Sequence, residues 1–191
     1  MERPDFVHLH LHSEYSLSDG IIRIKELVSR ASSLQYSAVG LTDLTNLFGL
    51  LEFYRSSREK GIKPIVGAEV NVIKDKDSLP APIVLLVKDK QGYINLTKIV
   101  SKAYVDGQVN GEPMVELSLL QKYSEGLIAL SGGMEGHVGQ SILAGNILLT
   151  ESRINFFKSI FGEDFFIEVH RLGKTNEEEY NNAAVEIATK L

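Results

Sequence analysis

Three histidines occupy alternate positions near the start of the chain, within the segment FVHLHLHSEYSLSDG that begins at Phe6. They are His8, His10 and His12. If this segment is a strand, alternate side chains point to one face, so three imidazoles would converge there. Imidazole suits zinc, manganese or iron, especially where carboxylates complete the site. The spacing therefore predicts a metal site, or the remains of one.

Three carboxylates could join these histidines, namely Asp19, Asp43 and Glu69. Asp43 follows one apolar run and Glu69 lies within the next, so both could face the mouth formed by the carboxyl ends of neighbouring strands. Each has a structural alternative: Asp19 and Asp43 could cap the helices that follow them, and Glu69 could be a solvated strand residue. His137 and His170 are isolated in the sequence, and we expect structural or surface roles for them.

Other reaction centres are missing from the sequence. The Asp-x-Asp pair Asp75 and Asp77 lies in an expected loop, so we find no site for two-metal nucleotidyl transfer. The glycines after Ser131 are followed by Met134 and not by Gly-Lys-Ser, so there is no phosphate-binding loop of the Walker type. A Gly-x-Ser-x-Gly motif is also missing, which argues against a serine hydrolase.

The elements that must position these side chains alternate along the chain. Short apolar runs predict strands at Phe6–Leu11, Ala38–Thr42, Pro64–Ile73, Pro82–Val87, Leu127–Ser131 and Phe165–His170. Between and after them, apolar residues recur with helical spacing, as at Ile24, Leu27, Val28 and Ala31, at Leu47, Leu50, Leu51 and Tyr54, and at Tyr180, Ala183, Ala184 and Ile187. This alternation predicts an α/β fold with a parallel sheet, either open or closed into a barrel.

The totals fit one compact domain. The 191 residues are enough to bury a core, and 43% apolar with 24% charged residues is ordinary for a globular protein. A net charge of −5 argues against an autonomous nucleic-acid binder. The chain has no cysteine, which excludes disulfides and thiolate ligands and fits the cytoplasm. The longest apolar run, Ile83–Val87, is too short to span a bilayer, so we expect a cytoplasmic domain without membrane contact.

Six segments occur in a familiar order: FVHLHLHSEYSLSDG, AVGLTDLTNLFGLLEFY, GIKPIVGAEV, GYINLTKIVSKAY, GLIALSGG and FFIEVHRLG. Together they closely resemble the N-terminal domain of bacterial DNA polymerase III alpha subunits, a domain of the polymerase and histidinol phosphatase (PHP) type. The resemblance covers essentially the whole chain. It implies a distorted seven-stranded (β/α) TIM-like barrel with a cluster of up to three metals at its mouth. In active relatives, a metal-activated water attacks a phosphoester.

Four metal positions of the family have matching residues here. The His-x-His pair of the family falls on His10 and His12, its next acid on Asp19, and its glutamate after Gly-x on Glu69. His8 then becomes a neighbour of the ligand pair and not a ligand itself. The resemblance implies that these four residues form a vestigial site of low metal occupancy.

Other ligand positions of the family have changed. The family motif Thr-Asp-His-Gly-Asn has Leu44 in place of its histidine, Gly133 occupies the place of a cysteine or similar ligand, and Leu172 replaces a histidine before glycine. The final Asp-x-His pair of the family would lie beyond Leu191. Because leucine cannot bind a metal, we expect no three-metal centre and at most one weakly held zinc or manganese ion. We therefore expect no catalytic residues in this segment and little or no phosphoesterase activity.

The resemblance also implies a context. We expect residues 1–191 to be a single PHP domain, truncated before its last strand, at the start of a longer DNA-directed DNA polymerase, a magnesium-dependent nucleotidyltransferase of DNA replication. Its expected role is that of a scaffold and docking domain for the proofreading exonuclease (epsilon) subunit, with DNA contacted through the parent polymerase. Two rival functions are a stand-alone metal-dependent phosphoesterase similar to histidinol phosphatase and an active 3'-5' proofreading nuclease of PHP type. The same lost ligands argue against both rivals.

Overall fold

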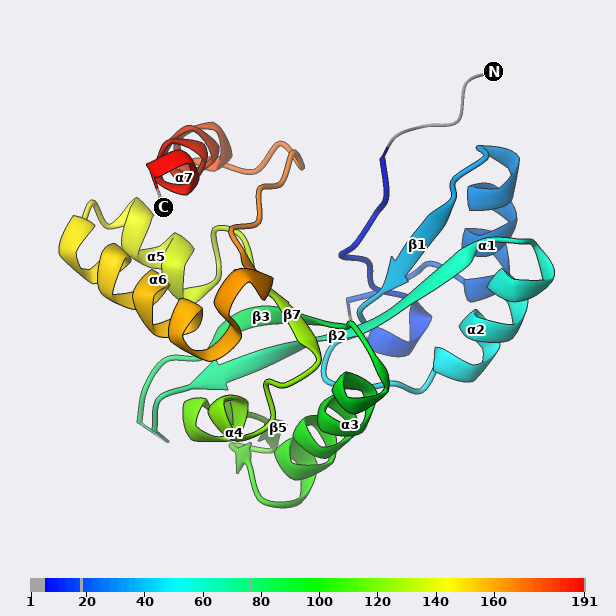
Figure 1. The fold of residues 1–191 in the computed structure, drawn as a ribbon, viewed down its shortest axis with the longest axis horizontal. Helices are drawn as coiled ribbons and strands as arrows, with labels where there is room; N and C mark the ends of the chain where they lie inside the picture. Colours follow the sequence, from blue (N-terminus) through cyan, green and yellow to red (C-terminus); the bar gives the residue numbers. More distant parts are fainter. Residues whose placement is uncertain (1–5, 18, 76, 191) are drawn as a thin grey trace.

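The computed structural model describes residues 6–17, 19–75 and 77–190. A six-stranded sheet runs through the molecule with helices on both sides of it (Figure 1). The strands are β1 (Ala38–Leu41), β2 (Lys63–Ile73), β3 (Ala81–Val87), β6 (Val115–Glu116), β7 (Leu127–Leu130) and β8 (Phe165–Phe166), while β4 (Gln108–Val109) and β5 (Glu112–Pro113) form a separate ribbon. The helices are α1 (Ile24–Ser33), α2 (Leu50–Glu59), α3 (Lys90–Val105), α4 (Leu117–Lys122), α5 (His137–Leu143), α6 (Ile147–Phe161) and α7 (Glu177–Lys190), with 3₁₀ turns at Glu14–Ser16 and Gly162–Asp164.

The sheet is mixed, not parallel as predicted. Along the order β1-β2-β3-β7-β8, the β1–β2 and β7–β8 pairs are parallel, but β3 is antiparallel to both of its neighbours. The physical reason is the short connection between Ile73 and Ala81, because a parallel return needs a crossover of a dozen or more residues. The expected α/β class is confirmed. The described strands β1 and β8 lie at opposite ends of this order and do not pair, so a closed seven-stranded barrel is not confirmed.

The predicted first strand, Phe6–Leu11, lies along β1 without forming a regular ladder. The Gly40 amide donates to the His8 carbonyl at 2.7 Å, and the Thr42 amide donates to the Leu11 carbonyl at 2.9 Å. A Cβ at Gly40 would lie 2.7 Å from the carbonyl oxygen of Leu9, so only glycine permits this close approach. The segment is therefore held beside β1.

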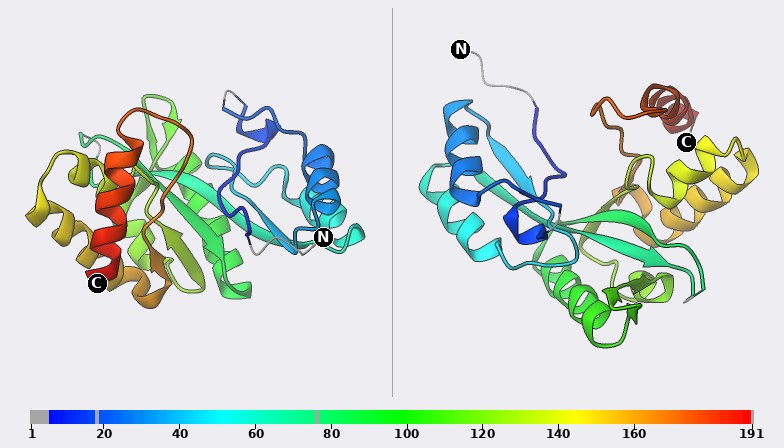
Figure 2. Two further views of the ribbon diagram at one scale, coloured as in Figure 1. Left: turned by 90° about the horizontal axis from the view of Figure 1, so that it is seen from above. Right: turned by 180° about the vertical axis from the view of Figure 1, so that it is seen from behind.

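Of the three apolar clusters in the described residues, the two larger ones stabilise the two halves of the sheet. The larger cluster joins β2, β3 and β7 to α3 and α6, with Val70, Leu85, Leu96, Ile99, Leu127, Ile154 and Phe157 among its buried members. The smaller cluster joins β1 to α1 and α2 through Ile24, Val28, Val39, Phe53 and Ile62. Figure 2 shows α1 and α2 beside β1, and α5, α6 and α7 at the opposite end, near β7 and β8.

The predicted buried faces of the helices are confirmed for α1 and α7 but not for α2. Ile24, Val28 and Ala31 of α1 are buried, as are Tyr180 and Ala184 of α7. In α2 the predicted stripe is wrong, because Leu51 and Tyr54 are exposed and the helix instead buries Phe53. Among the helices that the structure describes, none has the length and apolar character needed to span a bilayer.

Candidate metal centre

Asp43, which follows β1, forms hydrogen bonds with the loop after His12. Its carboxylate is buried and accepts hydrogen bonds from the Ser13 amide at 2.6 Å, the Ser13 hydroxyl at 2.8 Å and the Ser16 hydroxyl at 2.7 Å. The sequence suggested a metal-facing carboxylate or a helix cap. The structure gives neither, because the oxygens of Asp43 are occupied by this loop. The contacts hold the chain just after His12 in one place.

His10, His12 and Glu69 converge on one point. Nε2 of His10 lies 2.7 Å from Oε2 of Glu69, and Nε2 of His12 lies 3.7 Å from the same oxygen. The three residues form a group whose potential ligand atoms all lie within 4.8 Å of one another. Glu69 reaches this point from β2, and His10 and His12 reach it from the segment beside β1. The structure thus brings together three of the four residues predicted to bind metal.

Asp19, the fourth predicted ligand, contacts the other side of the His12 ring. Its Oδ2 lies 2.5 Å from Nδ1 of His12, and its side chain is largely exposed. A carboxylate on Nδ1 holds the proton there, so the lone pair of the ring lies on Nε2. That Nε2 atom is buried and has no hydrogen-bond partner among the described residues. A buried imidazole nitrogen that has no hydrogen-bond partner and lies beside a carboxylate is well placed to bind a metal ion.

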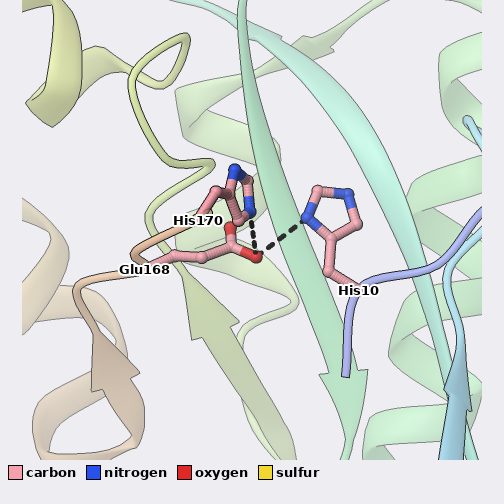
Figure 3. A group of neighbouring side chains, drawn as sticks. All are labelled: His10, Glu168 and His170. Atoms are coloured by element: carbon pink, nitrogen blue, oxygen red, sulfur yellow. Dashed lines mark hydrogen bonds and ion pairs between the residues drawn. The ribbon is translucent and has the colours of Figure 1, made fainter. Parts of the chain in front are cut away.

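His10 is held in the same way by Glu168, which the sequence did not predict as a site residue. Nδ1 of His10 lies 2.8 Å from Oε1 of Glu168, and Nε2 of His170 lies 2.9 Å from that same oxygen (Figure 3). Glu168 and His170 lie after β8, because the predicted strand Phe165–His170 is wrong beyond Phe166, where pairing with β7 ends. Glu168 and His170 have the same one-residue spacing as His10 and His12. This spacing was the feature of the sequence that could have indicated them as site residues. His170, expected to be structural or on the surface, lies within the centre.

Two carboxylates flank the ring of His10 and change its proton affinity. Burial works to lower the pKa of His10, but hydrogen bonds from the ring to Glu168 and Glu69 outweigh it and raise the pKa from 6.5 to about 9. For Glu168, burial works to raise the pKa, but hydrogen bonds from His10 and His170 lower it from 4.5 to about 2. A metal that binds Nε2 of His10 must displace a proton from that atom.

The other histidines stay outside the centre. His8 packs against the rings of Phe6 and Tyr36, with centroid distances of 4.9 and 5.5 Å, and belongs to neither His/Glu group found in the described residues. This agrees with its expected role as a neighbour of the ligand pair. Nε2 of His137 lies 3.2 Å from the carbonyl oxygen of Val72, and His137 belongs to neither group, which agrees with a structural role.

The three changed ligand positions offer no metal ligand. Leu44 forms a backbone bridge to Glu69, so the position that has lost its histidine adjoins a residue of the centre. Gly133 has no side chain, and Leu172 is exposed at the rim. The centre opens into a cleft of about 440 Å³ that is also lined by Glu135 and Lys174, which pair with each other at 2.7 Å.

Comparison with known proteins identifies the family. The model of the PHP domain family matches residues 8–172. This chain belongs to the PHP domain family. The PHP domain is 43% identical over 190 residues to DNA polymerase III subunit alpha of Escherichia coli K12 and 39% identical over 190 residues to that of Vibrio cholerae. These matches cover 98% of the chain but 16% of each relative, so the chain spans about a sixth of their length.

A solved structure supports the fold of the PHP domain. It belongs to a Bifidobacterium adolescentis protein provisionally named a metal-dependent phosphoesterase. The two structures align with a TM-score of 0.58 and 15% identity, covering 97% of this chain and 85% of the other. At that identity the likeness concerns the fold alone.

Proposed function

We propose that this PHP domain is part of a DNA polymerase III alpha subunit, where it acts as a scaffold and docking domain. The identity of 43% over 98% of the chain supports this proposal. The parent chain would extend DNA from deoxynucleoside triphosphates with magnesium, using carboxylates outside this segment. The direct test is the gene sequence beyond codon 191. A long continuing reading frame with polymerase-type acidic motifs is expected, and a stop codon there would contradict the proposal.

The site supports binding of one divalent ion, zinc or manganese, through Nε2 of His10, Nε2 of His12 and Glu69. Two imidazoles and one carboxylate form a ligand set that suits such ions. When bound, the ion would polarise a coordinated water. Asp19 and Glu168 would orient the two rings by accepting the Nδ1 protons, a role that commonly fixes metal-binding histidines.

A phosphoesterase needs more than this site offers. Hydrolysis by a metal cluster uses neighbouring metals to stabilise the attacking and leaving oxygens. Leu44, Gly133 and Leu172 supply no ligands for such neighbours. We therefore propose that the domain hydrolyses phosphoesters poorly or not at all. Incubation with p-nitrophenyl phosphate and with a DNA primer, each in excess manganese or zinc, tests this directly. Turnover that is lost in the His10→Ala variant would establish the rival phosphoesterase or nuclease function.

A scaffold role agrees with the contrast between core and site. The two larger apolar clusters are buried, while three ligand positions of the family have changed. If a separate exonuclease subunit proofreads, the packing of the domain stays necessary after its metal cluster is lost. Titration of the domain with the epsilon exonuclease subunit in a calorimeter should give saturable binding. Binding that is confined to other parts of the alpha subunit would remove the docking role from this domain.

A further inference from the structure

A second group of potential ligands shares His10 with the first. It consists of His10, Glu168 and His170, whose potential ligand atoms lie within 4.8 Å of one another (Figure 3). Oε1 of Glu168 lies between the two rings, 2.8 Å from Nδ1 of His10 and 2.9 Å from Nε2 of His170. The first group uses the opposite nitrogen of His10, so the two groups lie on opposite edges of one imidazole ring.

The carboxylate of Glu168 has an unused oxygen. Only 8% of this side chain is exposed, and Oε2 is buried without a hydrogen-bond partner among the described residues. A buried carboxylate oxygen without a hydrogen-bond partner destabilises the folded state, because it has lost its hydrogen bonds to water and forms none with the protein. A cation beside Oε2 would satisfy it.

The backbone that carries these ligands is fixed on both sides. The Glu168 amide donates to the Ser131 hydroxyl at 3.0 Å, and the Glu168 carbonyl accepts from the Tyr180 hydroxyl at 2.6 Å. The His170 carbonyl accepts from the Asn181 side chain at 2.5 Å. Contacts from α7 and from the end of β7 thus hold both ligand residues in place without a metal, which lowers the cost of binding one.

His170 stands where a side chain at position 133 would extend. Gly133 has φ +60°, and a Cβ built on it would lie 2.9 Å from Cε1 and Nδ1 of the His170 ring. The family ligand expected at position 133 is missing, and an imidazole from position 170 fills the space in front of it. The space that a side chain at position 133 would enter is therefore occupied by an imidazole from the segment after β8.

We propose that Glu168, His170 and Nδ1 of His10 form a second position for a divalent cation, zinc or manganese, which competes with the first position for His10. This inference rests on the proposed first position for the competition, not for the ligand group itself. A neutral imidazole has one lone pair, so a cation on one nitrogen of His10 leaves the proton on the other. One cation per chain can occupy either position, and the two-metal arrangement needed for phosphoester hydrolysis does not form.

Zinc titration calorimetry on the full chain and its variants separates the two positions. His12→Ala disables the first position, His170→Ala disables the second, and the double variant disables both. His8→Ala is the matched control, since this histidine lies in the same segment outside both groups. We expect one zinc per chain in the wild type, the control and each single variant. The double variant should bind more than about 100-fold more weakly, because losing even an outer partner of a ligand costs 10–100-fold.

Each alternative result has a distinct meaning. Loss of zinc binding in His12→Ala, with none in His170→Ala, would overturn the second position and leave the first. Loss in His170→Ala alone would overturn the first position and leave the second. Two zinc ions per wild-type chain would overturn the competition for His10. Thermal melts confirm that each variant folds, and His170→Gln replaces His170→Ala if the latter does not.

Discussion

Nδ1 of His10 lies 2.8 Å from Oε1 of Glu168, although the two residues are 158 positions apart in the chain. The contact joins the segment beside β1 to the segment that follows β8. Because the small cluster holds one partner and α7 holds the other, the candidate metal centre forms only when both ends of the sheet are folded. Changes at this contact should therefore affect both stability and metal binding.

Replacing Glu168 tests the contribution of this contact to stability. Glu168→Gln keeps the shape of the side chain but removes the charge that both His10 and His170 contact. Hydrogen bonds to charged groups contribute about 1.5–3 kcal/mol each, so we expect a loss of that order in the free energy of unfolding, measured in urea.

Glu186→Gln is the control for this measurement. Glu186 pairs with Lys190 on the exposed face of α7, and such pairs contribute little to stability. We expect no measurable change. An equal effect of the two substitutions would show that the Glu168 contact carries no special weight.

Asp43 should contribute both to the stability of the domain and to zinc binding. Asp43→Asn weakens the contacts to Ser13 and Ser16 that fix the loop after His12. We expect the unfolding free energy to fall by about 1–3 kcal/mol, the cost of leaving a buried polar group unsatisfied, with weaker zinc binding alongside. Asp75→Asn, in the exposed loop after β2, should be nearly neutral. Unchanged stability in Asp43→Asn would refute the role of Asp43 as a loop anchor.

The stability of the metal-free protein should depend on pH through His10 and Glu168. The pKa of His10 is raised from 6.5 to about 9, so its contribution is complete below 6.5 and is lost as the pH rises through 9. The pKa of Glu168 is lowered from 4.5 to about 2, so its contribution is present above 4.5 and is lost as the pH falls through 2. The contribution of the pair should therefore be greatest between about pH 4.5 and 6.5.

Melting temperatures measured with a chelator present test this dependence. We expect a decline from pH 6.5 to 9 in the wild type and a flatter profile in His10→Gln, which lacks the titrating ring. Parallel profiles for the two proteins would contradict the assignment of this decline to His10.

A methyl group at position 133 should disturb His170. Gly133→Ala places a left-handed backbone conformation on a non-glycine residue, which costs about 1–2 kcal/mol, and also pushes a Cβ against the His170 ring. Gly61→Ala is the matched control, since Gly61 has φ +70° and open space around its Cβ. The excess loss of unfolding free energy in Gly133→Ala over Gly61→Ala measures the contact with His170. Equal losses would mean that His170 moves aside freely.

Local patterns in the sequence predicted much of this domain. The apolar runs located β1, β2, β3 and β7 to within a residue or two, because buried strands need continuous apolar residues. The alternation at His10 and His12, together with Glu69, predicted the first ligand group. The family resemblance then identified Leu44 and Leu172 as positions without ligands.

Long-range geometry was not predictable from those patterns. Glu168 and His170 join the centre through contacts with residues more than 100 positions away, and their Glu-x-His spacing alone does not predict which residues they contact. The antiparallel direction of β3 depended on the length of its connection, which the alternation of elements did not weigh. In α2, the helical spacing alone did not show which apolar residues face the core. Packing against β1 and α1 buries Phe53 and leaves Leu51 exposed.

Metal content and hydrolysis, measured on one preparation, test the central claim most directly. The protein is dialysed against zinc or manganese, its metal is counted by mass spectrometry, and the same sample is assayed with a phosphoester and a DNA primer. We expect at most one metal per chain and no hydrolysis above the level of His10→Ala. Two or more metals per chain, with hydrolysis that disappears in His10→Ala, would contradict the account.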